Sequence, residues 1–248
     1  VKGLYGSSKS FIISELFKNN NSNIFWILDE KEDAGFYFND CEKLITNNQL
    51  FYFPSSYTRD NNFKKTSTQN IFKRTEFIKN FYSSKSLAIT YPEALFEKII
   101  VKKELFNRKT NLKTGQLINL ETLNEKLFEL NFERVDFVVE PGDFSVRGGI
   151  VDVFSFSNDN PYRIEFFGDE IESIRIFDIE TQISINNINF IEILGDIENK
   201  EIDYDRENIF KFLQNDTIII SENIESLETR LSNCYKKLKS DNKKNIDE

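Results

Sequence analysis

Residues 139–178, "VEPGDFSVRGGIVDVFSFSNDNPYRIEFFGDEIESIRIFD", decide how this chain folds. Apolar and polar side chains alternate along most of the stretch, which is typical of strands that bury one face. The segments "EPGD", "SNDNP" and "FGDE" have the composition of turns. The stretch therefore predicts a run of antiparallel strands.

The same alternation divides the side chains between two faces. It places Tyr162, Ile164 and Phe166 on one face of "YRIEFF", and it places Arg163, Glu165 and Phe167 on the other. In "FSVRG" it separates Phe144 and Val146 from Arg147. If the apolar set is core, then Arg147, Arg163 and Phe167 project outward, and this is the composition of a protein-binding hot spot. Alternatively, the arginines pair with acidic neighbours and Phe167 packs under the turn; the spacing alone slightly favours this alternative. Because Ile171 and Ile174 differ in parity, either the last strand carries a bulge or the register assigned to it is wrong.

A helix precedes this sheet in the sequence. In "NLKTGQLINLETLNEKLFELNF" (111–132), a short strand and Gly115 lead into a leucine stripe at helical spacing, formed by Leu120, Leu123, Leu127 and Leu130. We interpret this stripe as core. Helix and antiparallel strands together predict a small α+β domain over residues 109–195.

The flanking segments have a different pattern. In residues 1–108, the apolar runs "SNIFWILDE", "QLFYFP" and "SLAITY" alternate with helix-like segments at 9–19 and 68–82, which predicts an α/β domain with a mainly parallel sheet. A further helix is expected in "YPEALFEKII", starting at Pro92. In residues 196–248 we expect an acidic helix around "YDRENIFKFLQN", a strand "DTIIIS" and a helix "NIESLETRLSNCYKKLKS" that return to the first domain, followed by a frayed end, "DNKKNIDE".

The amino-terminal segment "GLYGSSKS" resembles a phosphate-binding loop. Gly3, Ser8, Lys9 and Ser10 keep the spacing of such a loop, but Ser8 replaces the second glycine, where backbone freedom matters most. Asp29 and Glu30 follow a strand, yet we interpret them as a solvated strand end before a polar turn, "KEDAG", rather than as magnesium ligands. The segment therefore predicts a degenerate loop without NTPase activity.

Composition excludes several chemistries. The chain has no histidine, which removes Ser–His, Cys–His and His–metal sites, and we expect no catalytic residues and no metal site. Cys41 and Cys234 lack partners at zinc spacing and are interpreted as buried or idle thiols. No apolar run is long enough to span a membrane, so we expect a cytoplasmic protein without a membrane partner.

Charge is unevenly distributed. Residues 1–108 hold 16 lysines and arginines against 12 acidic residues, whereas residues 109–248 hold 16 against 29. The small excess of basic residues in 1–108 is too weak to predict strong DNA binding. Between Glu140 and Gln182 there are 10 acidic residues and 3 arginines, and this excess repels a phosphate backbone.

The glycine-rich "GDFSVRGGIVDVF", the arginine-opened "YRIEFFGDEIESIR" and the trailing "TQIS" occur in order. Together they resemble the N-terminal UvrB-homology module of the bacterial transcription-repair coupling factor (Mfd) family. The resemblance implies a helicase-like domain that has lost nucleotide binding and is interrupted by a small α+β domain. It further implies that ATP and magnesium are used by a translocase motor elsewhere in the full-length protein, and that this segment needs no cofactor.

In that family the inserted domain is the docking surface for UvrA, a component of the excinuclease. By resemblance, the contact residues fall on Arg147, Arg163 and Phe167. The full-length protein would recruit UvrA to RNA polymerase stalled at DNA damage, with polymerase and duplex DNA bound by other regions. Two alternatives stay open: a residual P-loop NTPase and a UvrB-like damaged-DNA-binding domain. Between the helix that follows the amino-terminal loop and "FYFPSS", the sequence shows no long hairpin of the kind that clamps damaged DNA. This argues against the DNA-binding alternative.

Overall fold

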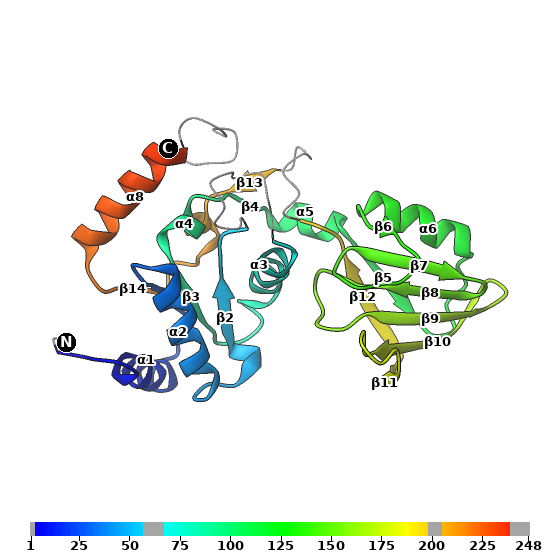
Figure 1. The fold of residues 1–248 in the computed structure, drawn as a ribbon, viewed down its shortest axis with the longest axis horizontal. Helices are drawn as coiled ribbons and strands as arrows, with labels where there is room; N and C mark the ends of the chain where they lie inside the picture. Colours follow the sequence, from blue (N-terminus) through cyan, green and yellow to red (C-terminus); the bar gives the residue numbers. More distant parts are fainter. Residues whose placement is uncertain (1–2, 57–66, 198–204, 239–248) are drawn as a thin grey trace. The chain divides into compact units, whose positions relative to one another are not determined.

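The structure is a computed structural model that describes residues 3–56, 67–197 and 205–238. The chain divides into two compact units (Figure 1): unit 1 comprises residues 1–99 and 205–248, and unit 2 comprises residues 100–204. The expected boundaries at 109 and 195 both lie within unit 2. The expected frayed end, 241–248, lies outside the described residues.

Unit 1 is built on the parallel sheet that the sequence predicts. Its order is β14-β1-β3-β2, and every neighbouring pair is parallel. The strands are β1 (Ile24–Ile27), β2 (Leu50–Phe53), β3 (Leu87–Thr90) and β14 (Ile218–Ser221). Because β14 pairs with β1, the carboxyl-terminal segment does return to the first domain.

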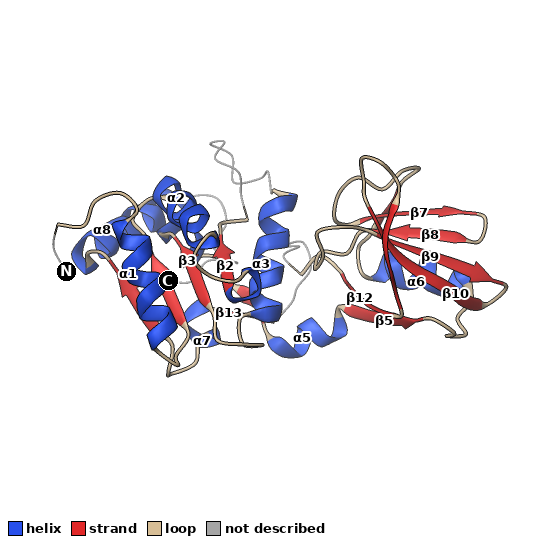
Figure 2. Cartoon of the chain, turned by 90° about the horizontal axis from the view of Figure 1, so that it is seen from below, coloured by secondary structure: helices blue, strands red, loops and turns tan. Residues whose placement is uncertain are grey.

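Helices cover both faces of this sheet (Figure 2), which explains why its central strands are continuous apolar runs in the sequence. The long helices are α1 (Ser8–Asn19), α2 (Lys31–Glu42), α3 (Thr68–Asn80) and α8 (Ile224–Leu238). The ring of Phe77 in α3 lies 6.0 Å from that of Phe25 in β1. On the opposite face, the ring of Tyr37 in α2 lies 5.2 Å from that of Trp26. Alternate residues of β1 therefore contact different helices.

Three local expectations in unit 1 were wrong. The segment "KEDAG" is not a turn but the start of α2, whose buried Ala34, Tyr37 and Cys41 recur at helical spacing. The helix expected over 91–100 stops after one turn, α4 (Pro92–Leu95), and is followed by β4 (Ile99–Ile100). The expected acidic helix is β13 (Arg206–Glu207) and a single turn, α7 (Ile209–Phe212). Segments as short as α4 and α7 receive their structure from packing rather than from helix propensity.

The short elements β4 and β13 pair where the chain leaves and re-enters unit 1. A 3-10 turn, η1 (Asn47–Gln49), precedes β2, and α5 (Lys102–Asn107) opens unit 2. In unit 2, β5 (Lys109–Lys113) pairs antiparallel with β12 (Phe190–Leu194) as a separate two-stranded sheet.

The main sheet of unit 2 has six strands in the order β11-β10-β9-β8-β7-β6. They are β6 (Glu133–Arg134), β7 (Asp143–Arg147), β8 (Ile150–Val153), β9 (Tyr162–Phe167), β10 (Glu170–Phe177) and β11 (Ser184–Ile188). From β7 to β11 all neighbours are antiparallel, as predicted, whereas the short β6 is parallel to β7. The register shifts between Ile171 and Ser173, which confirms the predicted bulge.

One face of this sheet is core. Helix α6 (Leu120–Glu129) buries Leu123 and Leu127, and the ring of Phe128 lies 5.1 Å from that of Phe144 in β7. Leu130, one residue past the helix, is also buried, so the leucine stripe is core as expected, with Leu120 at its half-buried edge. The opposite face, which we call the outer face, carries the alternate residues Ser145, Arg147, Ile150, Asp152, Arg163, Glu165, Phe167, Glu170, Ser173 and Arg175.

Candidate protein-docking face

Strand register places the three predicted docking residues on the outer face. Arg147 in β7 is opposite Ile150, Arg163 in β9 is opposite Asp152, and Phe167 at the end of β9 is opposite Glu170. Residues directly opposite each other in a sheet point to the same side. The structure thus brings together residues that lie up to 20 positions apart in the sequence.

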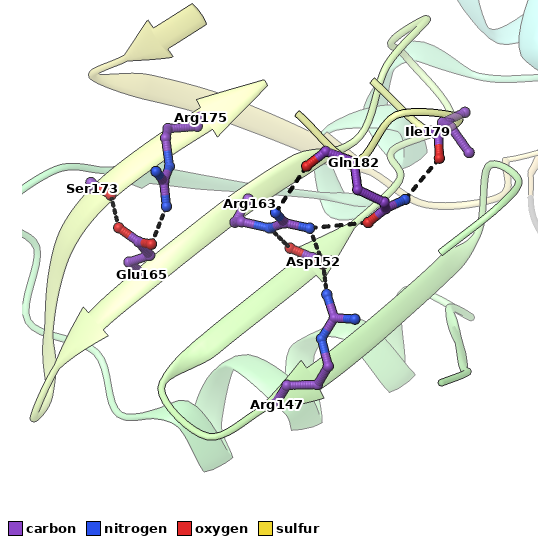
Figure 3. A network of polar contacts seen from close by, with 8 residues as sticks. All are labelled: Arg147, Asp152, Arg163, Glu165, Ser173, Arg175, Ile179 and Gln182. Carbon is purple, nitrogen blue, oxygen red and sulfur yellow. Dashed lines mark hydrogen bonds and ion pairs between the residues drawn. The ribbon is translucent and has the colours of Figure 1, made fainter. Parts of the chain in front are cut away.

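Asp152 is the centre of the charged part of this face (Figure 3). Its side chain is only 2% exposed, and its two carboxylate oxygens accept hydrogen bonds from Arg163 Nε at 2.7 Å and Arg163 Nη2 at 2.9 Å. Arg147 Nη2 donates to the same carboxylate. Two guanidinium groups therefore share one buried carboxylate, which fixes both in place.

Arg163 is held more tightly than Arg147. Its side chain is 16% exposed, it also contacts Gln182, with Nη2 3.2 Å from Oε1, and its guanidinium lies 4.3 Å from the ring centroid of Phe177. The hydrogen bond to Asp152 raises the pKa of Arg163 above its usual value, and burial offsets part of this rise. The guanidinium group of Arg163 is thus held in place by Asp152, Gln182 and Phe177.

Arg147 and Phe167 are the accessible members. The Arg147 side chain is 42% exposed and lies 5.4 Å from the exposed ring of Phe137. Phe167 is 78% exposed at the β9–β10 turn. The alternative drawn from the sequence is therefore right that the arginines pair with an acidic residue and wrong that Phe167 packs under the turn.

Asp152 was not predicted from the sequence as the shared partner of the two arginines. A neighbouring group on the same face was not predicted either: Glu165 accepts a hydrogen bond from Ser173 Oγ at 2.7 Å and forms an ion pair with Arg175 (Figure 3). Alternation in "GIVDVF" already places Asp152 away from Val151 and Val153. That signal identifies its face, but the pairing depends on strand register.

In unit 1, the amino-terminal loop is arranged differently. Ser8 Oγ donates to the carbonyl of Tyr5 at 2.7 Å, Lys9 Nζ donates to Glu222 Oε1 at 2.6 Å, and the buried Ser10 donates to Asp40 Oδ2 at 3.1 Å. Gly3 has a φ of 82°, which favours glycine. The side chains of Lys9 and Ser10, which would hold a phosphate, thus face carboxylates, and negatively charged carboxylates repel phosphate.

Burial lowers the pKa of Lys9, but the hydrogen bond and charge of Glu222 more than offset this, and the pKa is raised. At the end of β1, Asp29 accepts a hydrogen bond from Ser226 Oγ at 2.9 Å, and Glu30 forms an ion pair with Arg230. Both carboxylates therefore contact α8 rather than lying as a free strand end.

The buried Cys41 confirms one of the two thiol predictions. Burial raises its pKa to about 11, so it is an unreactive thiol at neutral pH. Among the described residues, no group of three or more His, Cys, Asp or Glu side chains is placed to hold a metal ion. None of the described helices is long and apolar enough to cross a membrane.

Comparison with known proteins identifies the domain that carries this face. Residues 110–198, which contain the whole outer face, match the family model of the UvrB interaction domain. The chain is 29% identical over 194 residues to the transcription-repair-coupling factor of Bacillus subtilis (strain 168), covering 78% of this chain and 16% of the relative. The chain is 27% identical over 236 residues to the Staphylococcus epidermidis (RP62A) protein of the same name, and this match covers 95% of this chain and 19% of the relative.

Unit 2 therefore contains a domain of the UvrB interaction type. Over most of its length the chain is also similar to transcription-repair-coupling factors. It spans less than a fifth of the length of these relatives.

Proposed function

We propose that the chain is a docking module that binds the excinuclease component UvrA through the outer face of unit 2. In a full-length protein it would recruit UvrA to RNA polymerase stalled at DNA damage. The family match supports an interaction role, and the names of the relatives join transcription with repair.

The observation that carries the proposal is the combination of an exposed aromatic ring with fixed guanidinium groups on one face. Phe167 offers a large apolar surface to a partner, and Arg147 offers planar donors already oriented by Asp152. Residues ordered before binding lose less conformational entropy when the complex forms. Tyr, Trp and Arg dominate binding hot spots, and exposed Phe supplies the same apolar contact.

Calorimetric titration of the 248-residue chain with purified UvrA tests this proposal. We expect Arg147→Ala, Arg163→Ala and Phe167→Ala each to weaken binding by about 2 kcal/mol, or about 30-fold. Arg134→Ala and Phe106→Ala are matched controls, because both residues are exposed in unit 2 but lie outside the outer face. Unchanged affinity in all three variants would refute the docking face.

We also propose that the chain hydrolyses no nucleotide and needs no cofactor. Glu222 and Asp40 engage the side chains of Lys9 and Ser10, so these two side chains already have partners other than a phosphate. ATP and magnesium would act in a motor region of the full-length protein. Titration with ATP and magnesium should give no saturable heat; micromolar binding that disappears in Lys9→Ala would restore the NTPase alternative.

RNA polymerase and duplex DNA would be bound by other regions of the full-length protein, and we propose a cytoplasmic location. The acidic excess of the tract from Glu140 to Gln182 opposes binding of a phosphate backbone to unit 2. A duplex DNA gel-shift series at increasing salt checks this point. A salt-sensitive shift near physiological ionic strength would favour the DNA-binding alternative.

A further inference from the structure

Leu117 is an exposed apolar residue that the proposed function does not use. It lies in the connection between β5 and α6 and is 77% exposed, nearly the same as Phe167. Large apolar side chains that gather on a surface mark interaction sites more often than scattered ones do. We infer that Leu117 is a further docking residue, which contacts the same partner protein as Phe167.

Backbone hydrogen bonds fix Leu117 beside the β9–β10 turn. Leu117 forms an antiparallel bridge with Glu170, and Ile118 N donates to the carbonyl of Asp169 at 2.8 Å. Gly115 N donates to the carbonyl of Ile171 at 2.8 Å, and Ile171 N donates back to the carbonyl of Gln116 at 3.0 Å. Residues 115–118 thus line the start of β10 as a short additional strand.

This pairing places three side chains in one row across the outer face. Leu117 is opposite Glu170, and Glu170 is opposite Phe167. Opposite residues share a face, and neighbouring strands lie about 4.8 Å apart, so the backbones at Leu117 and Phe167 are about 10 Å apart. One partner protein can cover both side chains, because a specific interface buries about 800 Å² on each side.

The row also indicates the chemistry of the partner surface. Between the two apolar side chains lies the exposed carboxylate of Glu170, which suits a basic residue flanked by apolar ones. At the other end of the face, the exposed Arg147 suits an acidic residue. Opposite charges at the two ends allow the partner to bind in only one orientation.

This inference rests on the proposed function, and its test measures affinity for purified UvrA by calorimetry on the 248-residue chain. We expect Leu117→Ala to weaken binding about 10-fold and Leu117→Asp to weaken it further, because a charge cannot enter an apolar contact. Leu117→Met should bind almost normally, since it keeps the apolar volume. Melting temperatures should not change, because the side chain is exposed.

Phe106→Ala is the matched control, because Phe106 is also exposed but lies beyond the opposite end of β5. If Arg147→Ala weakens binding while Leu117→Ala and Leu117→Asp do not, the inference fails and the proposed function stands. If the unaltered chain does not bind UvrA, both fail. A photocrosslinking residue placed at 117 or at 167 should attach to neighbouring segments of UvrA; attachment to distant segments would also overturn the inference.

Discussion

The amino-terminal loop of unit 1 and the outer face of unit 2 both bring basic side chains against carboxylates, but with opposite consequences. In the loop, Lys9 pairs with Glu222, and both side chains are partly exposed. On the outer face, the carboxylate of Asp152 is buried beneath the two arginines that it binds. A carboxylate at the surface forms an exposed ion pair with a basic group, whereas a carboxylate buried beneath two arginines fixes the orientation of both guanidinium groups.

The strongest test of this comparison removes the buried carboxylate. Asp152→Ala should lower the free energy of unfolding by about 3 kcal/mol or more, because Arg163 is left largely buried without its charge partner. Urea denaturation measures the change. Asp159→Ala, at an exposed position in the β8–β9 connection, is the control. A loss below about 0.5 kcal/mol for Asp152→Ala would show that the carboxylate does not organise the face.

The two arginines should differ from each other in stability. Arg163→Ala should cost about 2 kcal/mol, because it removes two charged hydrogen bonds and a stacked ring contact. Arg147→Ala should cost less than about 1 kcal/mol, since its side chain is half exposed. Thermal unfolding of both variants checks the order. Equal losses would mean that Arg147 is as structural as Arg163.

The burial of the Cys41 thiol beneath α1 can be tested by measuring stability as a function of pH. Burial raises the pKa of Cys41 to about 11 from an ordinary value of 9.0, so the folded chain holds this proton more tightly than the unfolded chain. The resulting stability is complete below about pH 9 and is lost as the pH rises towards about 11.

Between pH 7 and pH 10, the unaltered chain should therefore lose about 1 kcal/mol more unfolding free energy than Cys41→Ala. Urea denaturation with a reductant present measures both chains at both pH values. Equal losses would indicate that water reaches the thiol beneath α1.

The smallest effect is expected at the surface pair of the loop. Glu222→Ala should change the free energy of unfolding by less than about 0.5 kcal/mol, because partly exposed ion pairs contribute little. Urea denaturation at low and at moderate salt is the measurement. A loss comparable to that of Asp152→Ala would remove the contrast between the two regions.

Much of the fold could be predicted from the sequence. Continuous apolar runs predicted the parallel sheet, period-two alternation predicted strands β7 to β10, and the parity of Ile171 and Ile174 predicted the bulge. The 12-residue helix α2 was missed, because its first residues were interpreted as a turn, and the single turns α4 and α7 were expected to be longer helices. The few residues of α4 and α7 carry weak local preferences that packing overrides.

For the candidate site, the sequence by itself determined which side chains leave the core, because alternation along a strand is a local property of the backbone. Arg147, Arg163 and Phe167 could be placed on one face in this way. Only the tertiary structure decided that Asp152 lies beneath both arginines, that Leu117 joins the row of Phe167, and that Glu222 reaches Lys9. These contacts depend on strand register and on the return of distant segments, which no local period records.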